Sequence, residues 1–242
     1  MGIDYYINNI SDDKLIGGGF EKKCYDFGDF VLLESRYLNG NQIDNEKSKV
    51  INIKNILDRL NINSYKIFDY RVVSDKIYVL ENKVKGGPLQ DTRVGIDSNI
   101  YINRLKELDN FDILKKFVSD YLSIIDSGLS IDPSNPNNFL FDGSSIHFID
   151  LGLFNNVDKK FVCFYIMHNI INTYCDINDI EDVDIISFYI NDIYSKVCSI
   201  YVELGYNDSM YSFSPNGLIS EYIDKKISKF RKNCVNERTK SI

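Results

Sequence analysis

The strongest indication of the fold comes from two nearby segments, IDPSNPNNFL (131–140) and FIDLG (148–152). Asp132 and Asn138 share a loop that contains two prolines, and Asp150 ends a short β run just before a Leu-Gly pair. Mg²⁺ in proteins is typically held by one or two carboxylates and fills its other positions with phosphate oxygens and water. Two carboxylates and an amide in this order therefore favour a magnesium and phosphate site. The alternative is that these residues form turns and helix caps, as Asp and Asn often do.

The first 82 residues are typical of short strands around one helix. Apolar residues at spacings of three and four predict the helix near residues 43–60, with Val50, Ile53, Leu57 and Leu60 on one face. The predicted strands are KLIGGG (14–19), KKCYDF (22–27), FVLLES (30–35), YKIFDYRVV (65–73) and KIYVLEN (76–82). KVKGGP, residues 83–88, then breaks the pattern as a hinge would.

The remainder of the chain is mostly helical. Apolar spacing predicts helices near residues 110–128, 159–176, 181–205 and 216–231. Two short β runs, FLF and IHFID, flank the turn pair Asp142-Gly143. The sequence therefore predicts an α+β, bilobal fold. Residues 1–82 form an N-lobe with a small antiparallel sheet and one helix, residues 83–88 a hinge, and residues 89–242 a mainly helical C-lobe.

Three glycines, Gly17, Gly18 and Gly19, lie between the first two β runs. Glycines let backbone amides approach an anion closely, because no Cβ intervenes. The run therefore predicts either a phosphate-binding loop or an ordinary glycine turn, and alone it does not separate the two.

Together these features resemble the protein-kinase-like superfamily, in particular the compact bacterial phosphotransferases related to aminoglycoside and choline kinases. The resemblance covers residues 13–155 by motif. LIGGGFEKKCY (15–25) resembles the family's glycine-rich loop, with Gly17 and Gly19 at its first two glycines and Lys22 at the third. Cys24 then falls where the family has a valine over the adenine.

The other motifs of the family are assigned by the same resemblance. Glu46 is the candidate for the helix-C glutamate, and Glu81 begins a run that resembles the family's hinge and closes with Gly-Gly-Pro-Leu. Ser130-Ile131-Asp132 corresponds to H-R-D, Asn138 to the metal-binding Asn, and Asp150-Leu151-Gly152 to D-F-G. The resemblance implies ATP and Mg²⁺ as cofactors, Asp132 as the catalytic base, and Asn138 and Asp150 as metal ligands.

The spacing of the metal-binding Asn departs from the family. The family usually has this residue five positions after the catalytic Asp, which here is Asn137. Matching the family's P-x-N-I-L to residues 136–140 selects Asn138 instead, with one residue inserted. We favour Asn138, because the apolar pair after it must enter the next strand.

The strand FVLLES departs from the family more seriously, because Glu34 occupies the place of its usual lysine. A carboxylate there would repel nucleotide phosphates, and it would face Glu46 as a like-charge pair. Lys22 is the candidate replacement, since its long side chain can reach the same phosphates from the glycine loop. The with-no-lysine kinases resemble this arrangement. Arg36 is a weaker alternative, and the plainest interpretation of Lys22 is a solvated loop charge.

The composition of the chain limits the classes of partner that we expect the protein to bind. The 242 residues carry a net charge of −7, which disfavours nucleic-acid binding through a general positive field. The basic segment at residues 225–240 is an exception, and is either a solvated helix end or a site for a polyanion. No apolar run approaches 18 residues, so we expect no membrane span, and the amino terminus does not resemble a secretory signal. Five scattered cysteines fit reduced thiols in the cytoplasm.

The sequence therefore predicts transfer of a phosphoryl group from a nucleoside triphosphate to a hydroxyl of a small molecule or of an unknown acceptor. The interval after Gly152 is short, whereas a protein kinase uses a longer segment to dock a peptide. Asp132 would accept the hydroxyl proton, and Lys22 would neutralise phosphate charge. One alternative is a pseudokinase that binds nucleotide or protein without transfer, which Glu34 favours. Another is nucleotidyl transfer to protein on the same scaffold.

Overall fold

The structure, a computed structural model, describes residues 1–18, 22–88, 98–132, 135–153, 158–171, 180–206 and 215–240. The chain divides into two compact units. The first unit holds residues Met1–Lys85 and Leu151–Leu153, and the second holds Gly86–Asp150 and residues 154–242. The boundary between Lys85 and Gly86 falls inside the expected hinge, residues 83–88.

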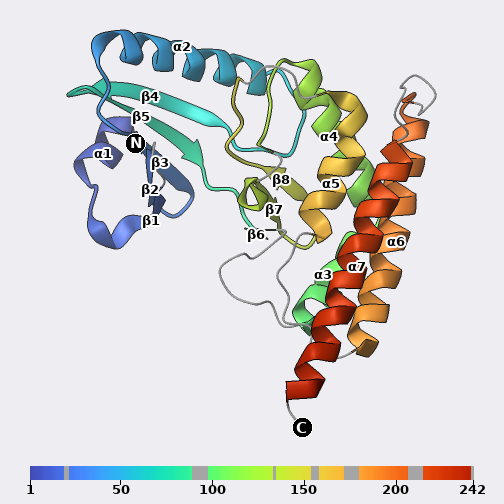
Figure 1. The fold of residues 1–242 in the computed structure, drawn as a ribbon. Helices are drawn as coiled ribbons and strands as arrows, with labels where there is room; N and C mark the ends of the chain where they lie inside the picture. Colours follow the sequence, from blue (N-terminus) through green and yellow to red (C-terminus); the bar gives the residue numbers. More distant parts are fainter. Residues whose placement is uncertain are drawn as a thin grey trace. The chain divides into compact units, whose positions relative to one another are not determined.

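The described part of the first unit is a five-stranded antiparallel sheet with two α-helices (Figure 1). The strands are β1 (Leu15–Gly18), β2 (Lys22–Asp26), β3 (Phe30–Ser35), β4 (Ile67–Val73) and β5 (Lys76–Asn82). They lie in the order β1-β2-β3-β5-β4. The helices are α1 (Ile3–Asn8) and α2 (Gly40–Leu57). The five predicted strands and the predicted helix are all present, whereas α1 was not predicted.

Local sequence explains where these elements begin and turn. Gly28, at φ +80°, makes the turn between β2 and β3. Ser74 and Asp75, at φ +47° and +64°, make the turn between β4 and β5, since two positive φ values suit a tight hairpin. A capping box starts α2: the Gln42 amide donates to Asn39 Oδ1, and the Asn39 amide donates to Gln42 Oε1. This box explains why α2 begins three residues before the apolar pattern that predicted it.

Different helices cover the two faces of this sheet. Ile3 and Tyr6 of α1 pack on one face, in a buried cluster with the strand residues Tyr25, Leu32, Tyr78 and Leu80. Side chains alternate along a strand, so Ile77 and Val79 of β5 point to the other face, where they are also buried. Helix α2 contacts both β4 and β5. The helices α1 and α2 therefore lie on opposite sides of the sheet (Figure 1).

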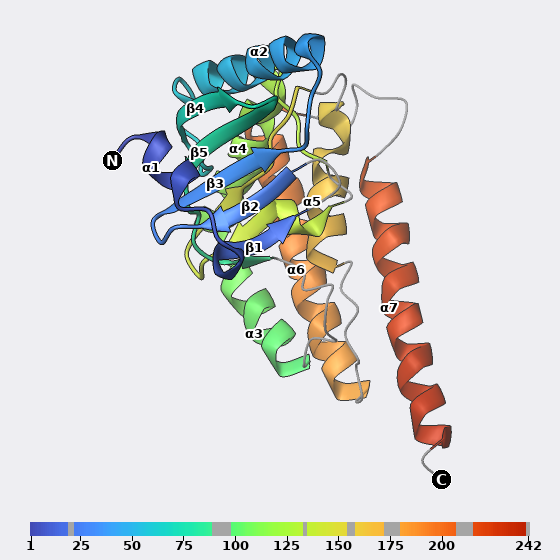
Figure 2. The same ribbon diagram turned by 90° about the vertical axis from the view of Figure 1, so that its left-hand side faces the viewer.

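The second unit is mainly helical in its described residues. Its helices are α3 (Ser98–Leu108), α4 (Phe111–Asp126), α5 (Val162–Ile171), α6 (Ile180–Glu203) and α7 (Pro215–Lys240). Helix α6 contacts the other four, and Figure 2 shows α3 beside α6. Its fully buried residues recur at helical spacing: Val183, Ile186, Ile190, Ile193, Val197 and Ile200. The predicted stop of α4 is confirmed, because Gly128 follows it at φ +80°.

A small three-stranded sheet adjoins these helices. It consists of β6 (Gly87–Pro88), β7 (Phe139–Phe141) and β8 (Ile146–Phe148), in that order. Gly86 precedes β6 at φ +112°, and a Cβ added to it would lie 2.6 Å from the carbonyl oxygen of Phe141. Only glycine fits this approach between the two backbones.

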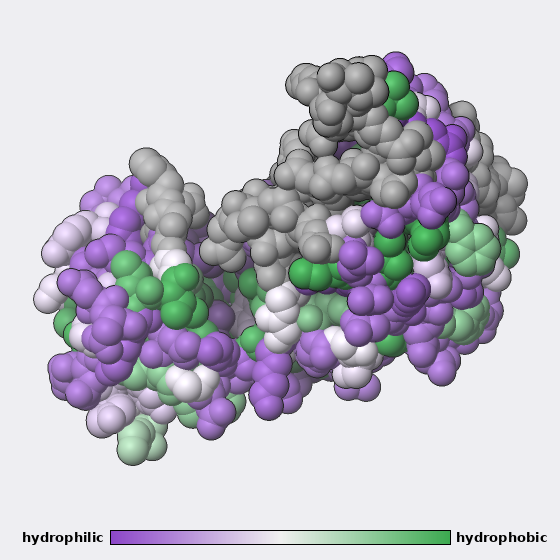
Figure 3. Space-filling model, turned by 90° about the horizontal axis from the view of Figure 1, so that it is seen from below, coloured by the Kyte–Doolittle hydropathy of each residue, from purple (hydrophilic) through white to green (hydrophobic). Residues whose placement is uncertain are grey.

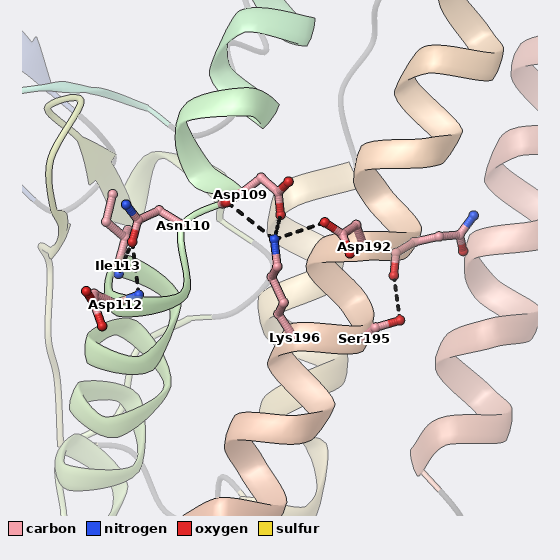
Figure 4. Close-up of polar contacts among 8 residues, drawn as sticks. Asp109, Asn110, Asp112, Ile113, Asp192, Ser195 and Lys196 are labelled. Atoms are coloured by element: carbon pink, nitrogen blue, oxygen red, sulfur yellow. Dashed lines mark hydrogen bonds and ion pairs between the residues drawn. The ribbon is translucent and has the colours of Figure 1, made fainter.

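A lysine bridge fixes the junction between α3 and α4 to α6 (Figure 4). The Lys196 ammonium of α6 donates to Asp109 Oδ1 at 2.5 Å and to Asp192 Oδ2 at 2.9 Å. Beside it, Asn110 caps α4 by accepting from the Asp112 amide at 2.9 Å. Burial raises the pKa of Asp109, and the hydrogen bond and charge of Lys196 lower it. Burial outweighs Lys196, so the pKa of Asp109 lies above its usual value. The junction thus depends on one cation shared by two carboxylates.

The expected α+β fold class is confirmed, with an antiparallel sheet in the first unit and a mainly helical second unit. Among the described residues, no helix combines the length and apolar character needed to cross a bilayer. On the face drawn in Figure 3, hydrophobic residues lie in small patches among hydrophilic ones.

Candidate functional site

Two of the candidate metal ligands lie at the same end of one hairpin in the second unit. Asn138 comes directly before β7, and Asp150 follows β8 by two residues. Phe139 and Phe148 face each other in the β7–β8 register, and the Ile149 amide donates to the Asn138 carbonyl at 2.9 Å. The hairpin therefore brings positions 138 and 150 to one edge, although they are twelve positions apart in the sequence.

Burial distinguishes Asn138, the predicted metal-binding asparagine, from Asn137. Asn138 is buried, with 3% of its surface exposed, whereas Asn137 is exposed. The Asn138 Nδ2 donates to the carbonyl oxygen of Asp132 at 3.4 Å. This hydrogen bond uses the amide nitrogen, so Oδ1 is the atom that suits a hard cation.

Asp150 has a left-handed backbone, with φ +57°. An L-residue in this conformation costs about 1–2 kcal/mol, and Asp tolerates it better than most residues. The positive φ belongs to Asp150 itself and not to Gly152, the glycine of the Leu-Gly pair that follows. Backbone strain of this kind gathers at functional sites. The Asp150 side chain is exposed.

Asp132 lies at the start of the loop that leads to Asn138. The preceding Ser130 and Ile131 are each 2% exposed, so the chain enters the loop from the core. The Asp132 carbonyl accepts from the Asn135 amide at 3.3 Å and from the Asn138 side chain. These contacts hold its backbone, while its side chain is exposed. Residues 133–134 lie outside the described part of the chain.

The first unit places three candidate nucleotide-binding residues on one face of its sheet. In the β2–β3 pairing Lys22 is opposite Ser35 and Cys24 is opposite Leu33. Leu33 is opposite Val79 of β5, so Glu81, two residues further, lies on the same face. The side chains of Lys22, Cys24 and Glu81 thus share the face that α2 covers.

The glycine run is part of the β1–β2 hairpin. Gly17 is opposite Cys24, and Gly18 is opposite Lys23. A Cβ added to Gly17 would meet no atom within 4 Å, so packing does not explain its lack of a side chain. Gly19, the third glycine of this run, lies outside the described residues.

Glu34 is on the opposite face of the sheet from Lys22 and is enclosed by polar partners. Its carboxylate accepts hydrogen bonds from the Lys76 ammonium at 2.5 Å, the Tyr25 hydroxyl at 2.7 Å and the Tyr78 hydroxyl at 3.2 Å. Only 7% of Glu34 is exposed. Burial raises the pKa of its carboxyl, but the hydrogen bonds from Lys76, Tyr25 and Tyr78 outweigh burial and hold the pKa below its usual value.

The contacts with Glu34 also shift the pKa values of Tyr25 and Lys76. Burial, followed by the hydrogen bond and charge of Glu34, raises the pKa of Tyr25 to about 12. The hydrogen bond to Glu34 raises the pKa of Lys76, whose ammonium also lies 4.4 Å from the Tyr37 ring centroid. The cluster is therefore a satisfied internal ion pair at neutral pH.

One expectation about Glu34 is therefore wrong. Glu34 does not face Glu46, because α2 covers the other side of the sheet. Glu46, about half exposed, instead pairs with Lys49 at 3.1 Å; it lies one turn before Val50, which is buried. Lys22 lies on the other face of the sheet from Glu34, and its neighbour across the strands is Ser35. Arg36 lies beyond the end of β3.

Sequence reasoning missed the partners of Glu34 because it missed α1. Ile3, Tyr6, Ile7 and Ile10 recur at spacings of three and four, and all four pack in or against the buried cluster. That pattern was the available signal for a helix covering the second face. No group of three or more His, Cys, Asp or Glu side chains in the described part of the chain is arranged to hold a metal.

Comparison with known proteins finds remote likenesses among solved structures only. No family model and no curated protein matches the chain. Among solved structures, it is similar to a mutant of the kinase domain of Mycobacterium tuberculosis PknI. The TM-score is 0.44 and the identity 11%, over 65% of this chain and 70% of that chain. A likeness this remote carries no argument about activity.

Proposed function

We propose that the protein transfers a phosphoryl group from a nucleoside triphosphate, with Mg²⁺, to a hydroxyl of a small molecule. The observation that carries the proposal is the hairpin edge that holds Asn138 and Asp150, tied by a hydrogen bond to the loop of Asp132. The donor set fits the metal: one amide oxygen and one carboxylate leave positions for phosphate oxygens and water. When bound, Mg²⁺ would neutralise charge on the transferred phosphoryl group.

Asp132 would orient the acceptor hydroxyl and take its proton. Its exposed carboxylate is accessible to a substrate, while its backbone is held by the Asn135 and Asn138 hydrogen bonds. A fixed backbone with an accessible side chain suits a group that must meet a bound substrate in one geometry.

Lys22 would supply positive charge for the phosphates, because β3 contains no lysine. It lies at the start of β2, directly after the glycine loop, on the α2 face together with Cys24 and Glu81. The loop amides near Gly17 and Gly18 would add hydrogen bonds to the same phosphates.

A small-molecule acceptor fits the segment that follows Asp150. Only residues 153–158 separate Gly152 from Lys159, and Lys159 is anchored to the helical unit. Its ammonium pairs with Asp126 of α4, and its carbonyl accepts from the Tyr201 hydroxyl at 3.2 Å. A segment so short and so tethered has little room to dock a peptide.

Replacing Asp150 tests the metal assignment. We expect Asp150→Asn to abolish Mg²⁺-dependent release of phosphate from ATP, because the amide keeps the shape but loses the charge that binds the metal. Asp142→Asn is the matched control: Asp142 is a carboxylate at the other end of the same hairpin, where it pairs with His147 at 2.9 Å. Full turnover in Asp150→Asn would sink the assignment.

A pseudokinase remains the second candidate, favoured by the absence of lysine from β3. A thermal shift with ATP and Mg²⁺ separates the two, since ligand at 100 times its Kd adds about 2.7 kcal/mol of stability. We expect a shift that Lys22→Ala removes and that Lys23→Ala keeps, because Lys23 lies on the other face, opposite Glu34. Binding without phosphate release would favour the pseudokinase, and no shift at all would contradict a nucleotide site of either kind.

A further inference from the structure

Strand β4 forms one edge of the five-stranded sheet in the first unit, and among the described residues only β5 pairs with it (Figure 2). Its seven residues, Ile67–Val73, include exposed apolar side chains. Phe68 is 54% exposed, and Val72 and Val73 are each more than a third exposed. An open edge with exposed apolar side chains is a template for pairing with another strand. The edge of β4 is therefore a candidate interaction surface.

The backbone groups of Tyr70 and Val72 point away from β5. A two-residue turn closes the β4–β5 hairpin, so its closing pair, Val73 and Lys76, exchanges backbone hydrogen bonds. Bonded and non-bonded pairs alternate along an antiparallel ladder, which directs the amides and carbonyls of Tyr70 and Val72 outward. The Tyr70 amide accordingly finds a side-chain acceptor, Asp69 Oδ1, at 2.8 Å. These outward groups are the ones that a further strand would bond.

We propose that β4 pairs with β4 of a second copy of the chain, antiparallel and with the two-fold axis at Tyr70. The outward backbone groups of Tyr70 then exchange hydrogen bonds with those of the second copy's Tyr70. Asp69 lies opposite the second copy's Arg71, and Arg71 opposite the second copy's Asp69. The axis thus creates two pairs of opposite charge, and opposite charges directly across two strands stabilise their pairing.

Charge selects this register over its neighbours. The side-chain period of a strand is two, so the registers that keep the outward backbone groups paired differ by two residues. A slip of two residues one way would set Arg71 opposite the second copy's Arg71, and the reverse slip would set Asp69 opposite the second copy's Asp69. Like charges directly opposite each other are unfavourable. The bulge in β4 between Ile67 and Asp69 also limits regular pairing to the residues that follow it.

Arg71 can serve this pair without leaving its present partner. Its Nη1 lies 2.6 Å from each carboxylate oxygen of Asp4 in α1, and a guanidinium has five N–H donors. The Arg71 side chain is 48% exposed, and Asp69 is exposed too. A second carboxylate can therefore approach Arg71 from across the edge. This surface lies in the first unit, and its pairing does not depend on the proposed phosphoryl transfer.

The oligomeric state of the full chain tests the proposal. We expect sedimentation equilibrium to give a monomer–dimer equilibrium, with the dimer at twice the chain mass of 28.0 kDa. Asp69→Arg and Arg71→Asp should each weaken the dimer about tenfold or more, because each places like charges opposite one another. The double variant, Asp69→Arg with Arg71→Asp, restores opposite charges across the axis and should recover the dimer. Asp4→Asn is the matched control, since it breaks only the ion pair within one chain and should leave dimerisation unchanged.

Cysteine crosslinking tests the register without changing any charge. Tyr70→Cys would place two cysteines across the axis at a hydrogen-bonded pair, about 5.5 Å apart at Cα, which is within the range of a disulfide. Val72→Cys is the control, because the second copy's residue 72 would lie four positions along the ladder, about 13 Å away and out of reach. Oxidation should crosslink Tyr70→Cys and leave Val72→Cys at the level of the parent, which has five cysteines of its own.

The outcomes separate clearly. A parent that stays monomeric over the whole concentration range overturns the proposal and leaves the edge to a strand of a different protein. A dimer whose affinity the single charge variants do not change, or the double variant does not recover, overturns the register. Equal crosslinking of the two cysteine variants overturns it too. If a charge variant has a lowered melting temperature, the crosslinking result decides alone.

Discussion

The variant Glu34→Lys distinguishes most sharply between two placements of residue 34. The family motif puts it at the phosphate-binding lysine, and the structure puts it on the α1 face. If Glu34 stood in the place of the family's phosphate-binding lysine, Glu34→Lys would restore that lysine and strengthen ATP binding. In the structure, the new ammonium would lie on the α1 face, beside Lys76 and against two tyrosine hydroxyls. We therefore expect a large loss of stability and no gain in nucleotide affinity.

The magnitude follows from the burial of the ion pair. The Glu34 side chain is 9% exposed and that of Lys76 is 21% exposed. Removing one partner of a buried pair costs about 3–5 kcal/mol, because the other charge is left uncompensated. Since Lys76 keeps some contact with water, we take the lower end, about 3 kcal/mol. For a chain of this size that corresponds to about 6–12 °C in melting temperature.

Thermal unfolding with and without ATP and Mg²⁺ measures both parts of this prediction. The charge-swapped double variant, Glu34→Lys with Lys76→Glu, is the control, and should recover part of the lost stability because it restores an ion pair. A Glu34→Lys protein with unchanged melting temperature and a larger ATP-induced shift would refute the placement of Glu34 on the α1 face.

The same carboxylate makes stability depend on pH in a defined direction. The pKa of Glu34 is held below its usual value in the folded protein, so its contribution is present above the unfolded pKa of about 4.3. It is lost as the pH falls through the lower, folded pKa. Glu34→Gln should therefore be less stable than the parent at pH 7, and the difference should shrink below pH 4. Unfolding midpoints measured at both pH values test this; a difference that stays constant would contradict it.

Two further predictions concern the second unit. Gly86→Ala should destabilise by about 2 kcal/mol or more, because its φ of +112° disfavours a side chain and the new Cβ would meet the Phe141 carbonyl. Gly40→Ala, where the Cβ meets nothing within 4 Å, should be neutral or stabilising in the same denaturant titration. Lys196→Met should cost about 1–2 kcal/mol at pH 7, because two carboxylates lose a shared, partly solvated cation. Since the pKa of Asp109 is already raised, that loss should diminish as the pH is lowered; a pH-independent loss would count against the shared charge.

Much of the fold follows from short-range signals in the sequence. Positive-φ residues mark the hairpin turns where the sequence places them, at Gly28, at Ser74-Asp75 and at Gly143. Apolar spacing found α2, α4 and α6 with ends within a few residues of the observed bounds. Helix α3 was missed along with α1. These signals are local, because a turn or an amphipathic helix is encoded within a few residues of itself.

The partners of Glu34 could not be read from the sequence in the same way. Its face depends on the register of β3 against β2 and β5, and a slip of one residue moves every side chain to the other face. It depends also on α1, a six-residue helix that is stable only through its packing on the sheet. The family motif fixed the position of the strand along the chain, but not which of two neighbouring residues points towards α2.

The conclusion that β3 lacks a lysine still holds, although Glu34 points to the face opposite to the one expected. It holds because it depends on the residues of the strand and not on the strand's register. Strand β3, Phe30–Ser35, contains no lysine, so no register could place a β3 lysine on the α2 face. The residues of β3 that do share a face with Lys22 are Val31, Leu33 and Ser35, none of them charged. Lys22 consequently meets no carboxylate from β3 on its own face, and the repulsion expected from Glu34 disappears. Glu34 is therefore no electrostatic objection to the proposed phosphate contact of Lys22, and the proposal still requires a lysine from outside β3.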